Sequence, residues 1–188
     1  MQRRMCLAFR AVLAGLTVLA LAGCGSTAQP SNPSAISADP ASLAELRRAD
    51  PDASRLLGGG ADEYKRRLAK ARPMGLVVNQ WASWCGPCRF ELPFFARLSQ
   101  RYRGRVAFVG VNAQDTRPAA RRFLARMPLP FPSYFDPSTS ISREFRAGYA
   151  WPTTAYYDDR GRLVRTHAGA YRSQAQLERD VRRYALNG

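Results

Sequence analysis

The chain has 188 residues, which is enough for one domain of ordinary size with extensions but not for two large domains. Its composition, 46% hydrophobic and 23% charged, is that of a globular protein and excludes a disordered or fibrous chain. No apolar run reaches the roughly 18 residues of a membrane-spanning helix, and four cysteines are too few for a scaffold held together by disulfides.

The formal net charge of +15 comes from 29 basic against 14 acidic residues. Nearly all the basic residues are arginines, which are spread along the chain with acids among them and without a nucleic-acid-binding motif. We therefore expect solvated helix faces and no nucleic-acid partner. Weak attraction to an anionic membrane surface is an expected side effect of the charge.

The N-terminus has the layout of a secretory signal. Three arginines in the first ten residues precede an uncharged stretch of small and aliphatic residues, 11–22. Residues 21–24 read LAGC, which resembles the lipobox of bacterial lipoproteins, in which the cysteine carries diacylglycerol. We predict a lipoprotein signal peptide over 1–23 and lipidation of Cys24; an ordinary signal peptide or an uncleaved anchor is the alternative.

Residues 24–42 are rich in Ser, Pro, Ala and Gly and contain almost no bulky apolar side chain. Such a segment cannot bury enough surface to offset the entropy of ordering it, so it predicts a flexible tether. The folded domain is then expected over 43–188. A tether behind a lipidated cysteine predicts a domain that works at a membrane, outside the cytoplasm.

The first part of the domain predicts helices that alternate with buried strands. The pattern of 62–71 is that of an amphipathic helix that Pro73 stops. The nearly continuous apolar runs at 74–82 and 106–111 are typical of strands buried on both faces. Between them, apolar side chains at helical spacing predict a core-facing helix over 88–102.

The second part predicts a helix opened by Thr116 and closed by Pro128, a Pro-rich stretch, and a helix around 138–146. A hairpin then joins a strand over 153–157 to a strand over 162–168. Ser173 and Gln176 form a capping box for the last helix, whose inner face is Leu177, Val181 and Tyr184. These elements describe a mixed α/β sandwich.

The sequence WCGPC at 84–88 connects the first buried strand to a helix. Cys85 is expected at the helix N-terminus, where unpaired N–H groups and the helix dipole stabilise a thiolate. Cys88 follows one turn later, close enough to attack a mixed disulfide formed on Cys85. Pro87 is tolerated because first-turn N–H groups lack helical partners. This spacing predicts redox catalysis.

Other uses of the cysteine pair fit less well. A zinc site needs four ligands, and only His167 is an obvious additional soft donor. Haem attachment needs a histidine after the second cysteine, where this chain has Arg89. A peroxiredoxin would have a threonine at residue 82, which is alanine. A purely structural disulfide remains the alternative.

The block VVNQWASWCGPCRFELPFF resembles the active site of the thioredoxin superfamily, and more narrowly that of extracytoplasmic TlpA/ResA-like thiol-disulfide oxidoreductases. The resemblance continues through GYAWPTT at 148–154 and covers about 75–184. It implies a thioredoxin-like three-layer α/β sandwich with a central mixed sheet. It also implies an extra strand-helix insert between about 114 and 134.

The resemblance also implies a substrate-binding set. Pro152 matches the family's cis-proline, which faces the cysteine pair and binds the extended backbone of the substrate; an ordinary proline at a strand start is the alternative. The other expected substrate-binding residues are Trp84, Gly86, Pro87 and Trp151.

Glu91 matches the acidic residue that these membrane-anchored proteins place near the thiols. A carboxylate there would raise the thiol pKa values and could carry the proton of Cys88. A solvated helix acid is the alternative. Asn79 occupies the position where cytoplasmic thioredoxins keep a buried aspartate, which makes Glu91 the better candidate for the proton-handling group.

We expect a monomeric reductant of disulfides in exported proteins such as apocytochrome c, with electrons supplied by a membrane thiol-disulfide relay and no cofactor. Gly86-Pro87 is the dipeptide of thioredoxin, whose potential is about −270 mV. An oxidant of exported proteins is one alternative. The other is a copper metallochaperone that binds the metal through Cys85, Cys88 and His167; we assign no metal site.

Overall fold

The fold is taken from a computed structural model, which describes residues 40–148 and 150–187. The predicted signal peptide, the lipidation site Cys24 and most of the predicted tether lie outside these residues. Within the described ranges, no helix is long and apolar enough to cross a membrane. The first helix begins at Pro40, three residues before the expected start of the domain.

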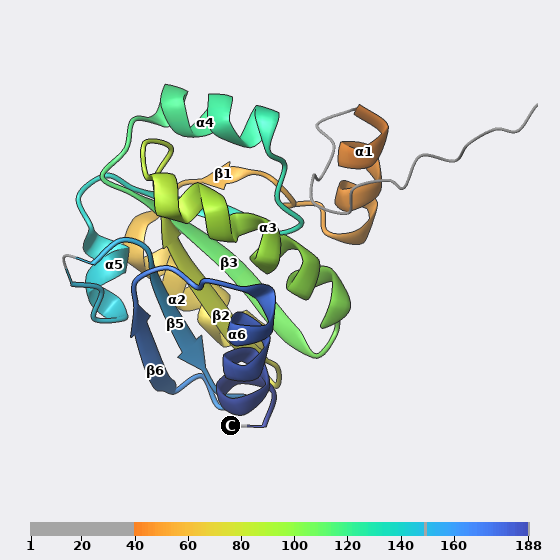
Figure 1. Cartoon of the computed structure of the whole chain (residues 1–188), viewed down its shortest axis with the longest axis vertical. Helices are drawn as coiled ribbons and strands as arrows, with labels where there is room; N and C mark the ends of the chain where they lie inside the picture. Colours follow the sequence, from red (N-terminus) through yellow and green to blue (C-terminus); the bar gives the residue numbers. More distant parts are fainter. Residues whose placement is uncertain (1–39, 149, 188) are drawn as a thin grey trace, which may run out of the picture. The chain divides into compact units, whose positions relative to one another are not determined.

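The centre of the domain is a mixed sheet of six strands in the order β1-β4-β3-β2-β5-β6 (Figure 1). The first four strands in this order are parallel to one another, and β5 and β6 add as an antiparallel hairpin. The strands are β1 (Leu56–Leu57), β2 (Gly75–Trp81), β3 (Val106–Ala113), β4 (Ser133–Asp136), β5 (Thr153–Tyr157) and β6 (Leu163–Ala168).

Helices cover both faces of this sheet, as expected for three layers. One face carries α3, α4, α6 and η1, and the other carries α2 and α5. The helices are α1 (Pro40–Ala49), α2 (Gly60–Ala71), α3 (Gly86–Arg101), α4 (Arg117–Arg126), α5 (Ser140–Glu144) and α6 (Gln174–Asp180), which continues as the π-helical turn η1 (Val181–Leu186).

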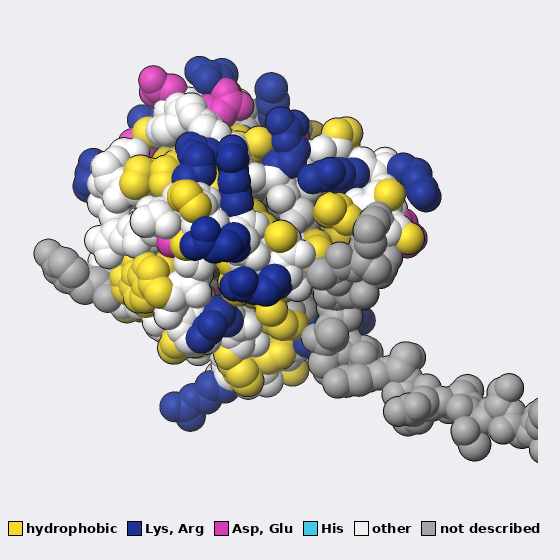
Figure 2. All heavy atoms as spheres, turned by 90° about the horizontal axis from the view of Figure 1, so that it is seen from above, with side chains coloured by type: hydrophobic (Ala, Val, Ile, Leu, Met, Phe, Trp, Pro, Cys, Tyr) yellow, Lys and Arg dark blue, Asp and Glu magenta, His cyan; other side chains and the backbone are white. Residues whose placement is uncertain are grey.

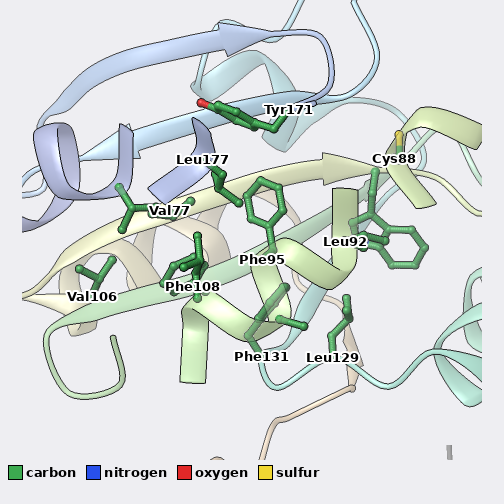
Figure 3. Close-up of a cluster of buried hydrophobic side chains, with 14 of the residues drawn as sticks. Val77, Cys88, Leu92, Phe95, Val106, Phe108, Leu129, Phe131, Tyr171 and Leu177 are labelled. Carbon is green, nitrogen blue, oxygen red and sulfur yellow. The ribbon is translucent and has the colours of Figure 1, made fainter. Parts of the chain in front are cut away.

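Strand β2 is buried along its whole length because both faces are covered. Val77 and Trp81 pack into the core under α3, whereas Leu76 and Val78 pack into the opposite core under α2 and α5. Figure 3 shows the first core, with Cys88 at one end of the cluster. Both cysteines of the redox pair therefore belong to the buried core under α3.

Two helices start at the predicted N-cap residues, although Gln176 does not complete the capping box with Ser173, because its Oε1 atom accepts from the N–H of Arg172 instead. The Oγ1 atom of Thr116 accepts a hydrogen bond from the N–H of Ala119, and the Oγ atom of Ser173 accepts one from the N–H of Gln176. These bonds pair N–H groups that the helices leave unpaired. Leu177 and Val181 are buried as expected, and Tyr184 packs against the edge of the core.

The structure contains elements that the sequence pattern does not predict. They are α1, the short strand β1, and β4, which lies in the Pro-rich stretch between Pro132 and Pro137. The segment expected as a strand-helix insert contains the helix α4 first, and only then the beginning of β4.

Candidate active site

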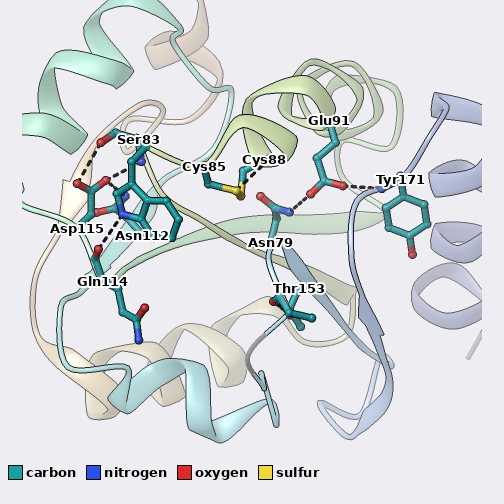
Figure 4. Close-up of a disulfide and its surroundings, with 12 residues drawn as sticks. Asn79, Ser83, Cys85, Cys88, Glu91, Asn112, Gln114, Asp115, Thr153 and Tyr171 are labelled. Atoms are coloured by element: carbon teal, nitrogen blue, oxygen red, sulfur yellow. Dashed lines mark hydrogen bonds between the residues drawn. A yellow bond between two sulfur atoms is a disulfide. The ribbon is translucent and has the colours of Figure 1, made fainter.

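The cysteine pair lies where β2 ends and α3 begins (Figure 4). Cys85 is the N-cap residue of α3, and its Sγ atom accepts a hydrogen bond of 3.2 Å from the N–H of Cys88. The two residues form a disulfide with their Cα atoms 5.3 Å apart. The cysteines are thus in the positions that the spacing predicts, one helical turn apart.

This position favours a thiolate on Cys85. The first turn of a helix has unpaired N–H groups and the positive end of the helix dipole, and both lower the free energy of an anionic sulfur. Cys85 is 3% exposed and Cys88 is fully buried, while Gly86 and Pro87 between them are exposed. An approaching substrate therefore reaches Cys85 before Cys88.

Two tryptophans lie beside the pair. Trp84 is 55% exposed, its ring centroid is 5.0 Å from that of Trp151, and its Nε1–H donates to the carbonyl of Gln114. The Trp151–Pro152 bond is cis, as the resemblance implies, and Pro152 is buried. Since Thr153 pairs with Gln80 near the end of β2, the proline lies at the same end of the sheet as the cysteines.

Glu91 is fully buried on α3, so its interpretation as a solvated acid is wrong. Its Oε1 atom accepts a hydrogen bond of 2.7 Å from Asn79 Nδ2, and its Oε2 atom accepts one of 2.8 Å from the N–H of Tyr171. Burial raises the pKa of Glu91 to about 7, although both hydrogen bonds favour the charged form. A carboxyl with this pKa exchanges protons near neutral pH.

His167 belongs to a second group of side chains around Tyr171. Its ring stacks on that of Tyr171 with centroids 4.1 Å apart, and the Tyr171 hydroxyl donates to Asp180 Oδ2 and lies 2.7 Å from the Tyr156 hydroxyl. Burial lowers the pKa of His167. Over 40–148 and 150–187, no three His, Cys, Asp or Glu side chains are grouped to hold a metal, so the structure does not bring together the copper ligands of the alternative hypothesis.

Asp115 is a residue of the site that no sequence motif predicts. Its carboxylate accepts hydrogen bonds from the N–H and Oγ of Ser83, from Asn112 Nδ2 and from the N–H of Thr116. Burial alone would raise the pKa of Asp115, but these bonds outweigh it and lower the pKa. The carboxylate ties the loop after β3 to the segment before Cys85. An acid directly before the N-cap Thr116 is the only local signal of this role.

Comparisons with known proteins agree with this geometry. The protein-family profile described as Redoxin matches residues 50–181. The thioredoxin-like protein YneN of Bacillus subtilis is 32% identical over 108 residues, which cover 56% of this chain and 62% of YneN. The thiol-disulfide oxidoreductase ResA of Bacillus cereus is 30% identical over 115 residues, covering 61% of this chain and 65% of ResA. The match therefore spans less than two thirds of these relatives.

A solved structure is also similar to this chain. The putative thiol:disulfide interchange protein DsbE of Chlorobium tepidum is 28% identical, with a TM-score of 0.56 over 61% of this chain and 82% of the DsbE chain. The likeness confirms the thioredoxin-like α/β fold that the active-site block predicts. The chain belongs to the Redoxin family, as a TlpA/ResA-like member of the thioredoxin superfamily.

Proposed function

We propose that this protein reduces disulfides in other proteins by dithiol-disulfide exchange at Cys85 and Cys88. The observation that carries the proposal is the Cys85–Cys88 disulfide at the N-terminus of α3. The relatives named as thiol-disulfide oxidoreductases support the same chemistry. Because only part of their length is matched, the activity of the whole chain remains a proposal.

The reaction proceeds in two exchanges. The Cys85 thiolate attacks one sulfur of the substrate disulfide, which forms a mixed disulfide and releases the first substrate thiolate. Cys88 then loses its proton and attacks the Cys85 sulfur, which forms the intramolecular disulfide and releases the second substrate thiolate. Two electrons pass to the substrate, and Glu91 accepts the proton of Cys88.

The surroundings of the pair suit a protein substrate. Trp84 and Trp151 offer an apolar surface beside the exposed Gly86-Pro87 turn. Pro152, which matches the family's substrate-binding proline, is proposed to contact the extended backbone of the substrate. Figure 2 views the molecule from above and shows basic side chains across the pictured face with hydrophobic side chains among them. The α4 arginines Arg121, Arg122 and Arg126 are exposed, as expected of a solvated helix face.

The proposal is tested with the full chain and insulin as a model protein disulfide, with dithiothreitol as the reductant. We expect the rate of insulin reduction to rise in proportion to the concentration of the chain, because each dithiol is regenerated after every exchange. A rate equal to that of dithiothreitol alone would contradict the proposed function.

We further propose an extracytoplasmic location, with the domain held at the membrane by diacylglycerol on Cys24. Its substrates are then exported proteins with disulfides, apocytochrome c among them, and a membrane thiol-disulfide relay returns it to the dithiol form. Two acyl chains suffice for stable anchoring. Replacing Cys24 with alanine should abolish labelling by a radioactive fatty acid and move the protein out of the membrane fraction. Continued labelling and anchoring would show that the lipobox assignment is wrong.

A further inference from the structure

Asn79 has a buried amide oxygen without a partner. The residue is 1% exposed, and its Nδ2 atom donates to Glu91, but its Oδ1 atom has no hydrogen-bond donor among the described residues. Buried polar atoms in folded proteins are nearly always paired. An exception beside a reactive centre needs an explanation, and a second state of the cysteine pair is one that can be tested.

The position of Asn79 limits which groups could donate to this oxygen. Asn79 lies two residues from both Val77 and Trp81 on β2, so the three side chains point to the same face of the sheet. Val77 and Trp81 pack in the core that also contains Cys88. The amide therefore lies on the face of the sheet that α3 covers. Figure 4 shows Asn79 between the disulfide and Glu91, with its oxygen on the side of the sulfur atoms and its nitrogen on the side of the carboxylate.

The disulfide state of the cysteines explains why the amide oxygen of Asn79 has no donor. A disulfide sulfur carries no hydrogen, so it cannot donate to Asn79 Oδ1. Reduction converts Cys88 into a thiol, whose S–H is a donor. The Cys88 thiol of the dithiol form is therefore a candidate donor for the amide oxygen that is unpaired in the disulfide form.

The hydrogen bonds of Glu91 add a second constraint. Within the described part of the chain, its two oxygens accept from Asn79 Nδ2 and from the backbone N–H of Tyr171, which suits the charged carboxylate. A protonated Glu91 needs an acceptor for its O–H. The N–H of Tyr171 is fixed in the backbone, whereas the amide of Asn79 can turn over and present its oxygen.

We propose that Asn79 is a positioning residue whose side-chain amide turns over as one proton moves between Cys88 and Glu91. In the first arrangement Glu91 is charged and accepts from Nδ2, while the Cys88 thiol donates to Oδ1. In the second, the Glu91 O–H donates to Oδ1, and Nδ2 donates to the Cys88 thiolate. The proton that leaves the thiol is the one that the carboxyl gains, so the pair keeps a single negative charge.

The inference rests on the proposed function, because only a dithiol cycle produces both states of Cys88. None of the titratable groups near Cys88 and Glu91 offers an alternative link for the proton between them. Tyr156 on β5 and Tyr171 before α6 have pKa values raised by burial and stay neutral. His167 on β6 stacks on the Tyr171 ring, and Asp180 on α6 accepts a hydrogen bond from the Tyr171 hydroxyl. Cys85 is the N-cap residue of α3.

A double-mutant cycle tests the coupling in the full chain, with Cys6, Cys24 and Cys85 replaced by serine so that Cys88 is the only thiol that titrates. The variants are Glu91→Gln, Asn79→Leu and both together, and the readout is the ionisation of Cys88 followed by ultraviolet thiolate absorbance. Glu91→Gln should ease ionisation of Cys88, because it removes a neighbouring negative charge. We expect this effect on the ionisation constant to shrink about fivefold when Asn79 is also replaced. An equal effect in both backgrounds would overturn the proposal.

Gln80→Leu is the matched control. Gln80 is the next residue of the same strand, is equally buried and also has an unpartnered amide oxygen, but its side chain lies on the opposite face of the sheet. Removing it should leave the effect of Glu91→Gln unchanged. If Gln80→Leu weakens that effect as much as Asn79→Leu does, the coupling does not depend on Asn79 in particular and the proposal is wrong.

A second measurement needs no change at Asn79 and does not depend on how its variants fold. In the reduced full chain, the side-chain amide signals of Asn79 in NMR spectra should shift with pH at the same midpoint as the carboxyl signal of Glu91. Amide signals that stay constant while Glu91 titrates would overturn the proposal. Insulin turnover without this coupling refutes the role of Asn79 alone, whereas coupling without turnover refutes the proposed function.

Discussion

Replacing Cys85 with serine is expected to reduce the rate of insulin reduction to that of dithiothreitol alone. Cys85 lies at the N-terminus of α3, which stabilises a thiolate, and it is the cysteine that an approaching substrate reaches first. A serine hydroxyl at the same N-cap position keeps the helix start but does not ionise near neutral pH. The measurement is the insulin assay, with circular dichroism to confirm that the variant is folded.

Cys88→Ser is the matched control, because it removes the second thiol and leaves the first. This variant should attack the substrate once and then stop, so mixed disulfides accumulate through Cys85. Non-reducing gels should show these adducts with Cys88→Ser and few with Cys85→Ser. Equal trapping by the two variants would contradict the assigned order of attack.

Replacing Glu91 with glutamine is expected to slow the release of substrate from the mixed disulfide about 100-fold, which is typical for the loss of a general base. Because the pKa of Glu91 is about 7, the rate of this step in the unaltered protein should rise as pH increases through 7. The glutamine variant should lack this rise. Single-turnover kinetics between about pH 5 and 9 would measure it, and an unchanged profile would contradict the role of Glu91.

The same pKa predicts an effect on stability. The pKa of Glu91 is raised from 4.5 to about 7 in the folded protein, so the folded state binds more protons than the unfolded state between these values. The contribution of Glu91 to the free energy of unfolding is therefore fully present below about pH 4.5. It is lost as pH rises through 7, which lowers the free energy of unfolding by about 3 kcal/mol at most. Urea unfolding of Glu91→Gln should lack this decrease. An identical decrease in both proteins would show that another group causes it.

The parts that the sequence predicts well are those with strong local signals. The apolar run before WCGPC can only be a buried strand or a buried helix, and its brevity favours the strand β2. Thr116 and Ser173 carry the capping side chains of their helices, so α4 and α6 start where expected. The cysteine pair follows from its spacing, because one helical turn brings the two side chains together.

The parts that it misses depend on contacts between distant residues. Strand β1 has two residues and β4 has four, and each exists because parallel neighbours pair with it. The buried state of Glu91 depends on the N–H of Tyr171, 80 residues away. Likewise, the carboxylate of Asp115 holds Ser83 across 32 residues. No local pattern indicates such pairs, since they arise only when the sheet is assembled.

The reduction potential of the Cys85–Cys88 pair is the most direct test of the account, because the proposed direction of electron flow depends on it. The full chain would be equilibrated with glutathione or dithiothreitol buffers, and its dithiol fraction and the pKa of the Cys85 thiol would be measured. The Gly86-Pro87 dipeptide and a negative charge on Glu91 both predict a reducing pair, with a potential near that of thioredoxin, about −270 mV. A potential above about −180 mV together with a Cys85 pKa below about 5 would identify an oxidant and contradict the proposed reductase.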